Sequence, residues 1–275
     1  MPVFEASDGA QIYFKDEGDG IPVLALAGLT RNGSDFDYLA PHLDGVRLIR
    51  MDYRGRGKSE WTGSDTYTIP IETNDAIALL AHLGISKAAV IGTSRGGLIA
   101  MTLAAITKGQ LLGVCLVDIG PEIDTRGLDT IRDYVGRNPV QDSYAEAAKM
   151  RAKLLAGFAN VPGSRWDEEV RKHYIETAEG LKINYDPALR DAVIASADSP
   201  IPDLWPLFEA FSDLPLALIR GANSDLLSEA TANEMSRRRP DMIRTDVPDR
   251  GHVPFLDEPQ SLDTINRWLL ACKSL

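Results

Sequence analysis

Cysteine and histidine are scarce in this chain of 275 residues. The chain has two cysteines, Cys115 and Cys272, and four histidines. None of them are paired at the short spacing that zinc sites use, so the sequence predicts neither a metal centre nor a cofactor bound through one. We expect both cysteines to be reduced structural thiols, as is usual in the cytoplasm.

Positive charge and long apolar runs are also in short supply. Lys and Arg number 29 against 40 Asp and Glu, which gives a formal net charge of −11 and disfavours nucleic acid and anionic membranes as partners. No apolar stretch approaches the roughly 20 residues of a membrane-spanning helix. The first residues, MPVFEASDGAQIYF, lack the basic and apolar regions of a signal peptide. We therefore expect a cytoplasmic, soluble protein whose partner is a small-molecule substrate, and the sequence leaves its oligomeric state open.

What the sequence does contain is an alternation of apolar strands and amphipathic helices. After a predicted hairpin over 2–18, continuous apolar runs predict buried strands, and helical patterns separate them. This order favours a parallel sheet covered on both faces, an α/β fold. The predicted strands lie within 21–28, 46–55, 88–92, 111–120, 214–225 and 242–252, and the predicted helices between and after them cover 34–43, 69–85, 96–107, 228–239 and 259–272.

The alternation stops after Gly120 and resumes near residue 212. Between them we find no clear strand, and the runs 143–158, 165–180 and 186–196 read as helices. The sequence thus predicts a core made of 1–120 and 212–275, with a helical cap inserted over 121–211.

A cluster of small residues lies between a predicted strand and a predicted helix. Gly92-Thr93-Ser94-Arg95-Gly96 matches the pattern G-x-S-x-G, the nucleophile elbow when it stands in that position. The sharp turn exposes the serine hydroxyl above the sheet, and it places the next backbone N–H, that of Arg95, at a helix N-terminus where negative charge is stabilised. Ser94 is therefore the predicted nucleophile.

A serine needs a base, and His252 is the histidine in a suitable place. It lies in the loop after the last predicted strand, in DRGHVPFLDEP, where α/β sheets carry their chemistry. His42 and His82 fall in or near helices, and His173 falls on a predicted solvated helical face.

The third member of a triad is a carboxylate that orients the histidine. Asp225, in LIRGANSDLL, and Asp118, in CLVDIGPE, both follow predicted strands and could both reach the site. We favour Asp225 because it keeps the order serine, acid, histidine, and we keep Asp118 as the alternative.

With these residues in place, the sequence resembles the α/β-hydrolase superfamily over nearly its whole length. The motifs that carry the resemblance are LALAGLTRNGSDF, MDYRGRGKSE, VIGTSRGG, LVDIGPE, IRGANSD and GHVPFLDEP. The resemblance implies a mostly parallel eight-stranded sheet with a helical cap inserted after the sixth strand. It implies Ser94, Asp225 and His252 as the triad, and it implies no cofactor.

The resemblance also indicates the surroundings of the nucleophile. The loop that supplies the second oxyanion N–H in relatives matches 27–30 here, which assigns Leu29 N–H together with Arg95 N–H; Ala27 replaces the histidine that many members have before Gly28. Asp52 and Arg54 read as a structural pair.

Two features of the site region allow more than one interpretation. The Arg95 guanidinium, unusual after the nucleophile, could face an acidic substrate group or brace a nearby carboxylate, and we favour the second. Trp205 and Phe208, with Phe211, would mostly pack the cap, but Trp205 and Phe208 could also line an apolar acyl pocket.

Together these features predict a serine hydrolase of small carboxylic esters or lactones that acts through an acyl-enzyme. Dehalogenases and epoxide hydrolases of the superfamily use aspartate at position 94, so the serine disfavours both. Two alternatives stay open: hydrolysis of a C–C bond in a vinylogous diketone, and a non-catalytic ligand-binding protein on the same fold.

Overall fold

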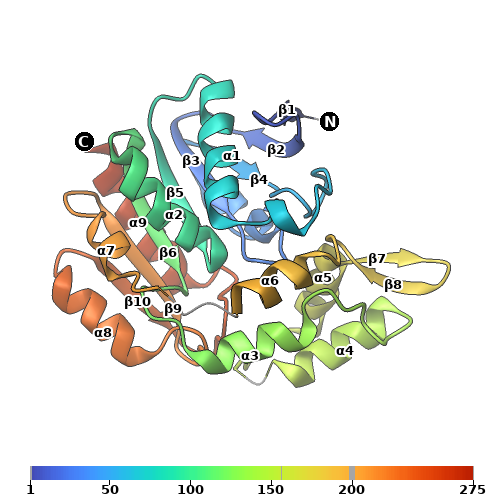
Figure 1. The fold of residues 1–275 in the computed structure, drawn as a ribbon. Coiled ribbons are helices and arrows are strands. Elements are labelled where there is room, and N and C mark those ends of the chain that lie inside the picture. Colours follow the sequence, from blue (N-terminus) through green and yellow to red (C-terminus); the bar gives the residue numbers. More distant parts are fainter. Residues whose placement is uncertain (1, 156, 198–201, 275) are drawn as a thin grey trace.

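An eight-stranded sheet forms the centre of the molecule in the computed structural model, which describes residues 2–155, 157–197 and 202–274 (Figure 1). The strand order is β1-β2-β4-β3-β5-β6-β9-β10, with β1 and β2 antiparallel to their neighbours and the other neighbouring pairs parallel. The predicted α/β-hydrolase architecture is confirmed. The strands are β1 (Val3–Glu5), β2 (Gln11–Glu17), β3 (Ile21–Leu26), β4 (Val46–Met51), β5 (Ala88–Thr93), β6 (Leu111–Val117), β9 (Leu216–Gly221) and β10 (Ile243–Val247).

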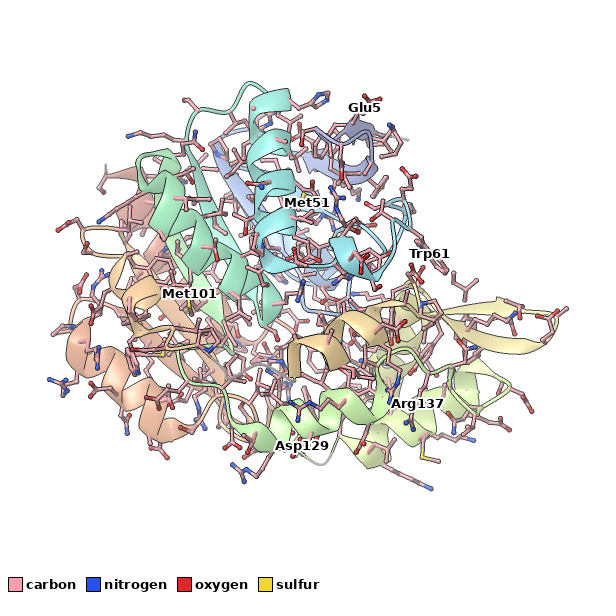
Figure 2. The ribbon with its side chains drawn as sticks, in the orientation of Figure 1. Glu5, Met51, Trp61, Met101, Asp129 and Arg137 are labelled. Carbon is pink, nitrogen blue, oxygen red and sulfur yellow. The ribbon has the colours of Figure 1, made fainter. Side chains whose placement is uncertain are left out.

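Helices cover both faces of this sheet. Side chains of α1 (Ile69–His82), α2 (Arg95–Thr107), α7 (Trp205–Glu209) and α8 (Glu229–Arg238) belong to the hydrophobic cluster on one face. The cluster on the other face includes side chains of α9 (Pro259–Lys273) and of the short 3-10 helices η1 (Gly33–Asp37) and η2 (Ala40–His42). Figure 2 shows these side chains filling the space between the layers, with Met101 of α2 fully buried.

The local sequence explains why these elements begin where they do. All six residues of β5 are buried, as the continuous apolar run predicts for a central parallel strand. Thr68 caps α1 by accepting a hydrogen bond from Ile71 N–H, and Ser228 caps α8 in the same way. The predicted helix over 34–43 is instead the pair η1 and η2. Asn32 caps η1 by accepting a hydrogen bond from Ser34 N–H.

The segment between β6 and β9 extends beneath the carboxyl end of the sheet, away from both termini (Figure 1). Its helices α3 (Thr125–Tyr134), α4 (Tyr144–Leu154), α5 (Gly163–His173) and α6 (Leu189–Ala197) precede α7. Its two strands, β7 (Tyr174–Thr177) and β8 (Gly180–Ile183), form an antiparallel hairpin. The expectation of no strand here was wrong, because the apolar residues of 174–183 were read at helical spacing and the turn at Ala178-Glu179 was missed.

No helix in the described residues is long and apolar enough to span a bilayer.

Cys115 and Cys272 are unpaired and buried, and burial raises the pKa of the Cys272 thiol to about 12. Both thiols are therefore protonated and unreactive at neutral pH.

Candidate active site

Ser94 occupies a strained turn between β5 and α2. Its φ is +50°, in a region that non-glycine residues rarely adopt. The turn leaves no space for side chains at the flanking glycines: a Cβ on Gly92 would lie 2.5 Å from Gly96 O, and one on Gly96 would collide with Leu26 O. The small residues of the motif are therefore a steric requirement of the turn, and the turn presents Ser94 Oγ at the carboxyl end of the sheet.

His252 connects the serine to an acid. Its Nε2 lies 3.0 Å from Ser94 Oγ, and its Nδ1 lies 2.6 Å from Asp118 Oδ2. A carboxylate accepts only, so Nδ1 carries the proton in this arrangement and Nε2 is free to accept from the serine hydroxyl. The three side chains form the hydrogen-bonded chain of a nucleophile, a base and a carboxylate that orients the base.

The carboxylate in this chain is Asp118, so the preference for Asp225 was wrong. Asp118 directly follows β6, the neighbour of β5 in the sheet, and this places it one strand away from Ser94. Asp225 lies in the loop after β9, one strand further out, where its side chain is exposed and near Arg126. Both aspartates satisfy the order serine, acid, histidine, so this criterion could not separate them.

The loop after β9 supports Asp118 instead of replacing it. The Asp118 side chain is fully buried, accepts from Gly221 N–H at 2.8 Å through Oδ1, and accepts from Ser224 Oγ at 2.6 Å through Oδ2. Sequence reasoning missed Ser224, although it stands one residue before the favoured aspartate. These bonds fix the carboxylate in the plane that faces His252.

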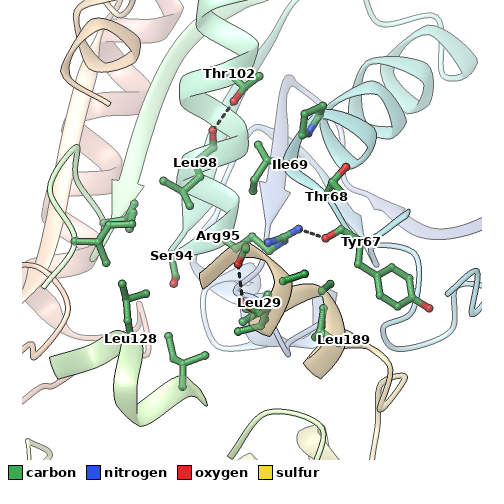
Figure 3. A pocket seen from close by; sticks show the side chains of 18 of the residues that line it. Leu29, Tyr67, Thr68, Ile69, Ser94, Arg95, Leu98, Thr102, Leu128 and Leu189 are labelled. Atoms are coloured by element: carbon green, nitrogen blue, oxygen red, sulfur yellow. Dashed lines mark hydrogen bonds between the residues drawn. The ribbon is translucent and has the colours of Figure 1, made fainter. Parts of the chain in front are cut away.

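Two backbone N–H groups near Ser94 are available for an oxyanion. Leu29 and Arg95 both line the pocket that contains Ser94 (Figure 3). In the described part of the chain, neither N–H donates a hydrogen bond. The Ala27 carbonyl accepts from Gly96 N–H at 3.1 Å and from the Tyr53 hydroxyl at 3.0 Å, which ties the 27–30 loop to the start of α2. The loop is thus braced without the histidine that relatives have at position 27.

The Arg95 side chain braces a carboxylate, as we favoured. Its Nε donates to Glu72 Oε2 at 2.5 Å, and its Nη2 donates to the Tyr67 carbonyl at 2.9 Å (Figure 3). Glu72 is fully buried in α1. The guanidinium is therefore bonded within the protein, to Glu72 and the Tyr67 carbonyl, rather than presented to an acidic substrate group.

A cavity of about 1020 Å³ opens beside Ser94. Its wall is mostly apolar, and Leu98 on α2 and Leu128 on α3 flank the serine (Figure 3). The core therefore supplies one wall and the segment between β6 and β9 supplies the other. Further apolar lining comes from Leu29, Ile69, Met101, Ile119, Ile123, Ile131, Leu189, Val193, Leu204, Leu207 and Leu226.

The predicted substrate-binding role of Trp205 and Phe208 is not supported, because neither lines this cavity. Phe208 is fully buried against Phe211 and belongs to the hydrophobic core. Trp205 donates through Nε1 to Glu122 at 2.8 Å. The helix α7 turns Leu207 toward the cavity instead, and a five-residue helix is too short for its facing side to be judged from periodicity.

Two other interpretations need correction. Asp52 and Arg54 are not paired: Asp52 accepts from the N–H groups of Gly33 and Lys58, whereas Arg54 forms a bidentate ion pair with Asp75. Both remain structural.

His173 is buried rather than solvated, with Nδ1 at 2.6 Å from the Glu169 carbonyl oxygen. Burial and the nearby Arg31 and Arg151 lower the pKa of His173 to about 4, so this imidazole is neutral at pH 7.

No group of three His, Cys, Asp or Glu side chains in 2–155, 157–197 and 202–274 is arranged to hold a metal ion. The site does bring together a serine, a histidine that is paired with a buried carboxylate, and two N–H groups that donate no hydrogen bond among the described residues.

Comparison with known proteins agrees with this geometry. Residues 23–262 match the model of the alpha/beta hydrolase family. The chain is 34% identical over 252 residues to the 3-hydroxybutyrate-oligomer hydrolase of Cupriavidus necator, covering 87% of this chain and 85% of that protein. It is 27% identical to the 2-(acetamidomethylene)succinate hydrolase of Mesorhizobium japonicum, covering 86% and 84%.

A solved structure is also similar over nearly the full length. The alpha/beta hydrolase from Novosphingobium aromaticivorans superposes with a TM-score of 0.91 at 35% identity, covering 98% of this chain and 97% of that one.

Proposed function

Because this chain belongs to the alpha/beta hydrolase family, we propose that it is a serine hydrolase that cleaves small carboxylic esters or lactones through an acyl-enzyme. The observation that carries the proposal is the hydrogen-bonded chain from Ser94 through His252 to Asp118 at the edge of an apolar cavity. Hydrolysis is the activity that the named relatives share. The ester or lactone bond is our inference.

In the proposed reaction, His252 Nε2 takes the proton of Ser94 Oγ as the oxygen attacks the substrate carbonyl. The N–H groups of Leu29 and Arg95 stabilise the oxyanion that forms. Asp118 keeps Nδ1 protonated and stabilises the imidazolium. His252 then donates the proton to the leaving alcohol, and a water activated by the same Nε2 releases the acid and regenerates Ser94.

The shape and polarity of the cavity support an uncharged, largely apolar substrate. Its volume of about 1020 Å³ lies at the upper end of the range for small-molecule sites, and it is enough for an extended ester. Two arginines line the cavity, and each is already paired with a carboxylate, Arg95 with Glu72 and Arg132 with Asp129, so they offer little to an anionic acyl group. Oligomers of 3-hydroxybutyrate are joined by ester bonds, so the name of the Cupriavidus relative is consistent with ester cleavage here.

A fluorophosphonate probe tests the proposal directly, since it phosphonylates only an activated serine. Intact mass should show one adduct on the wild-type protein, located to Ser94 by peptide mapping, and none on Ser94→Ala. The matched control is Ser212→Ala, which removes an exposed serine that is bonded to Lys108 and not to the triad, and it should still be labelled. Activity is then measured on p-nitrophenyl esters of increasing acyl length, a 3-hydroxybutyrate dimer, lactones and a vinylogous diketone.

The panel separates the competing functions. Turnover of esters or lactones supports the proposal, and turnover of the diketone alone assigns C–C bond hydrolysis. A wild-type protein that is neither labelled nor active on any member would instead be a ligand-binding protein on this fold.

A further inference from the structure

A buried cluster of two arginines and one glutamate lies directly behind the oxyanion groups. Arg56 and Glu72 are fully buried, and Arg56 Nη1 lies 2.9 Å from Glu72 Oε1. The other carboxylate oxygen accepts from Arg95 Nε at 2.5 Å. One carboxylate on α1 therefore joins a guanidinium from the loop after β4 to the guanidinium of the residue that follows the nucleophile.

The same cluster reaches both candidate oxyanion donors. Arg56 Nε donates to the Leu29 carbonyl at 2.9 Å, which holds residue 29 from behind. Arg95 is held through its own side chain by Glu72 and the Tyr67 carbonyl. The chain of contacts thus runs from residue 29 through Arg56 and Glu72 to residue 95, so a shift of one donor is transmitted to the other.

The charge of the cluster is unusual for a buried site. Two guanidinium groups share one carboxylate, which leaves a net positive charge next to Ser94. Burial and the neighbouring Arg95 lower the pKa of Arg56, whereas Glu72 opposes this shift. The Arg56 guanidinium lies over the rings of Tyr53 and Tyr67, 5.7 and 5.1 Å from their centroids, and these π-systems offset part of the desolvation.

A buried ion pair is weak evidence for a gain in stability, because desolvating the charges can outweigh their attraction. A fixed positive charge behind an oxyanion hole, in contrast, stabilises charge that develops only in the transition state. The position of the cluster matches the second role.

We propose that Glu72 is a positioning residue for the oxyanion hole. Glu72 holds Arg56 and Arg95 so that the N–H groups of residues 29 and 95 face the oxygen bound at Ser94. The inference rests on the proposed function. It implies that loss of Glu72 slows the formation of the tetrahedral adduct more than it weakens substrate binding.

The chain contains a matched ion pair for comparison. Asp75 lies three residues after Glu72 on α1, and Arg54 lies two residues before Arg56 in the same loop. Arg54 and Asp75 are buried to a similar degree and pair at 2.7 and 2.8 Å. The side chains of this pair form no hydrogen bond with Leu29 or Arg95, and only the Arg54 backbone carbonyl accepts from Arg56 Nη1, at 2.7 Å. Asp75→Asn thus removes a buried carboxylate of similar burial that has no direct bond to the groups holding residues 29 and 95.

The test compares Glu72→Gln with Asp75→Asn. We expect Glu72→Gln to lower both the second-order rate of fluorophosphonate labelling and kcat by about tenfold or more, with KM changed less than threefold. Asp75→Asn should lower the melting temperature by about as much as Glu72→Gln does. It should keep the wild-type labelling rate. Circular dichroism verifies that both variants are folded.

A second variant keeps the test decisive if Glu72→Gln does not fold. Arg95→Gln removes one guanidinium while Glu72 keeps Arg56 as its partner, so no buried carboxylate is left alone. It too should label at least about tenfold more slowly. Labelling of the folded variants at the wild-type rate, or equal slowing by Asp75→Asn, would overturn the inference while leaving the proposed function intact. A wild-type protein that does not label at all would overturn both.

Discussion

At the scale of single residues, the sequence singled out Ser94 and His252 but not the aspartate that the structure pairs with His252. Ser94 and His252 each stand in a distinctive local pattern, and in the structure Ser94 Oγ lies 3.0 Å from His252 Nε2. The acid depends on which strand neighbours β5, and strand order is a property of the assembled sheet that no local pattern encodes. The sequence favoured Asp225, but the aspartate that lies beside His252 is Asp118.

Asp118→Asn is expected to lower kcat by about 10⁴, because an amide can stabilise the wrong tautomer of His252. Steady-state rates on the best ester of the panel measure this. Asp225→Asn is the matched control and should retain at least half of the wild-type rate. If Asp225→Asn gave the larger loss, the carboxylate assignment drawn from the geometry would be wrong.

Phe208→Ala is expected to cost about 3–5 kcal/mol of unfolding free energy, the usual cost of truncating a fully buried Phe. Urea denaturation measures it. The KM for esters should stay within about twofold, since the ring does not line the cavity. A large rise in KM with little loss of stability would return Phe208 to the binding role that the sequence suggested.

At the scale of single elements, prediction succeeded where regular hydrophobic spacing extends over many residues. It failed where tertiary contacts determine the structure of a segment. The helices α1, α2, α8 and α9 were found because each has several turns with one buried face. The hairpin β7–β8 was not, because its four-residue strands carry too little pattern, and the ten-residue helix α3 was not predicted either. Helix α5 was found, but the burial of its last residue, His173, was not.

The burial of His173 makes the stability of this region depend on pH. Its pKa is about 4 in the folded protein against 6.5 for an ordinary histidine, and it faces Asp35 and Glu169 as well as Arg31 and Arg151. The stabilisation is complete above pH 6.5. It is lost as the pH falls from 6.5 to about 4, because the unfolded chain takes up the proton first, and the loss is on the order of 3 kcal/mol.

The urea midpoints measured at pH 7 and pH 4.5 should therefore differ less in His173→Gln than in the wild-type protein. Exposed His82 offers the control, and His82→Gln should leave the pH dependence unchanged. If the urea midpoint of His173→Gln fell as steeply as that of the wild type, the pH dependence would be assigned to carboxylates instead of His173. Arg31 lowers the pKa of Asp35 to about 2, so this carboxylate titrates at lower pH.

At the scale of the whole molecule, the cavity forms where the sheet-bound helix α2 faces the segment between β6 and β9. The sequence predicted an inserted segment at this place, and the division into a core of 1–120 and 212–275 with a cap of 121–211 stays a prediction. It did not predict which side chains of the two parts meet, because that depends on how α3 and α6 are oriented over the sheet.

Leu98→Trp should shorten this cavity, because the residue lies on α2 facing α3 (Figure 3). We expect kcat/KM for a p-nitrophenyl octanoate to fall by about tenfold or more, while that for the acetate changes less than twofold. Ile106→Trp, at an exposed position of the same helix, should change neither. Equal losses on both esters would place the acyl chain elsewhere.

Asp225 is exposed and does not contact the triad, and its carbonyl packs near Gly127 at the start of α3. Both natural thiols are buried and protonated. A cysteine introduced at position 225 would accordingly be the accessible thiol for maleimide chemistry, and a fluorophore attached there would report on movement of α3 relative to the sheet while Ser94, His252 and Asp118 all stay unchanged.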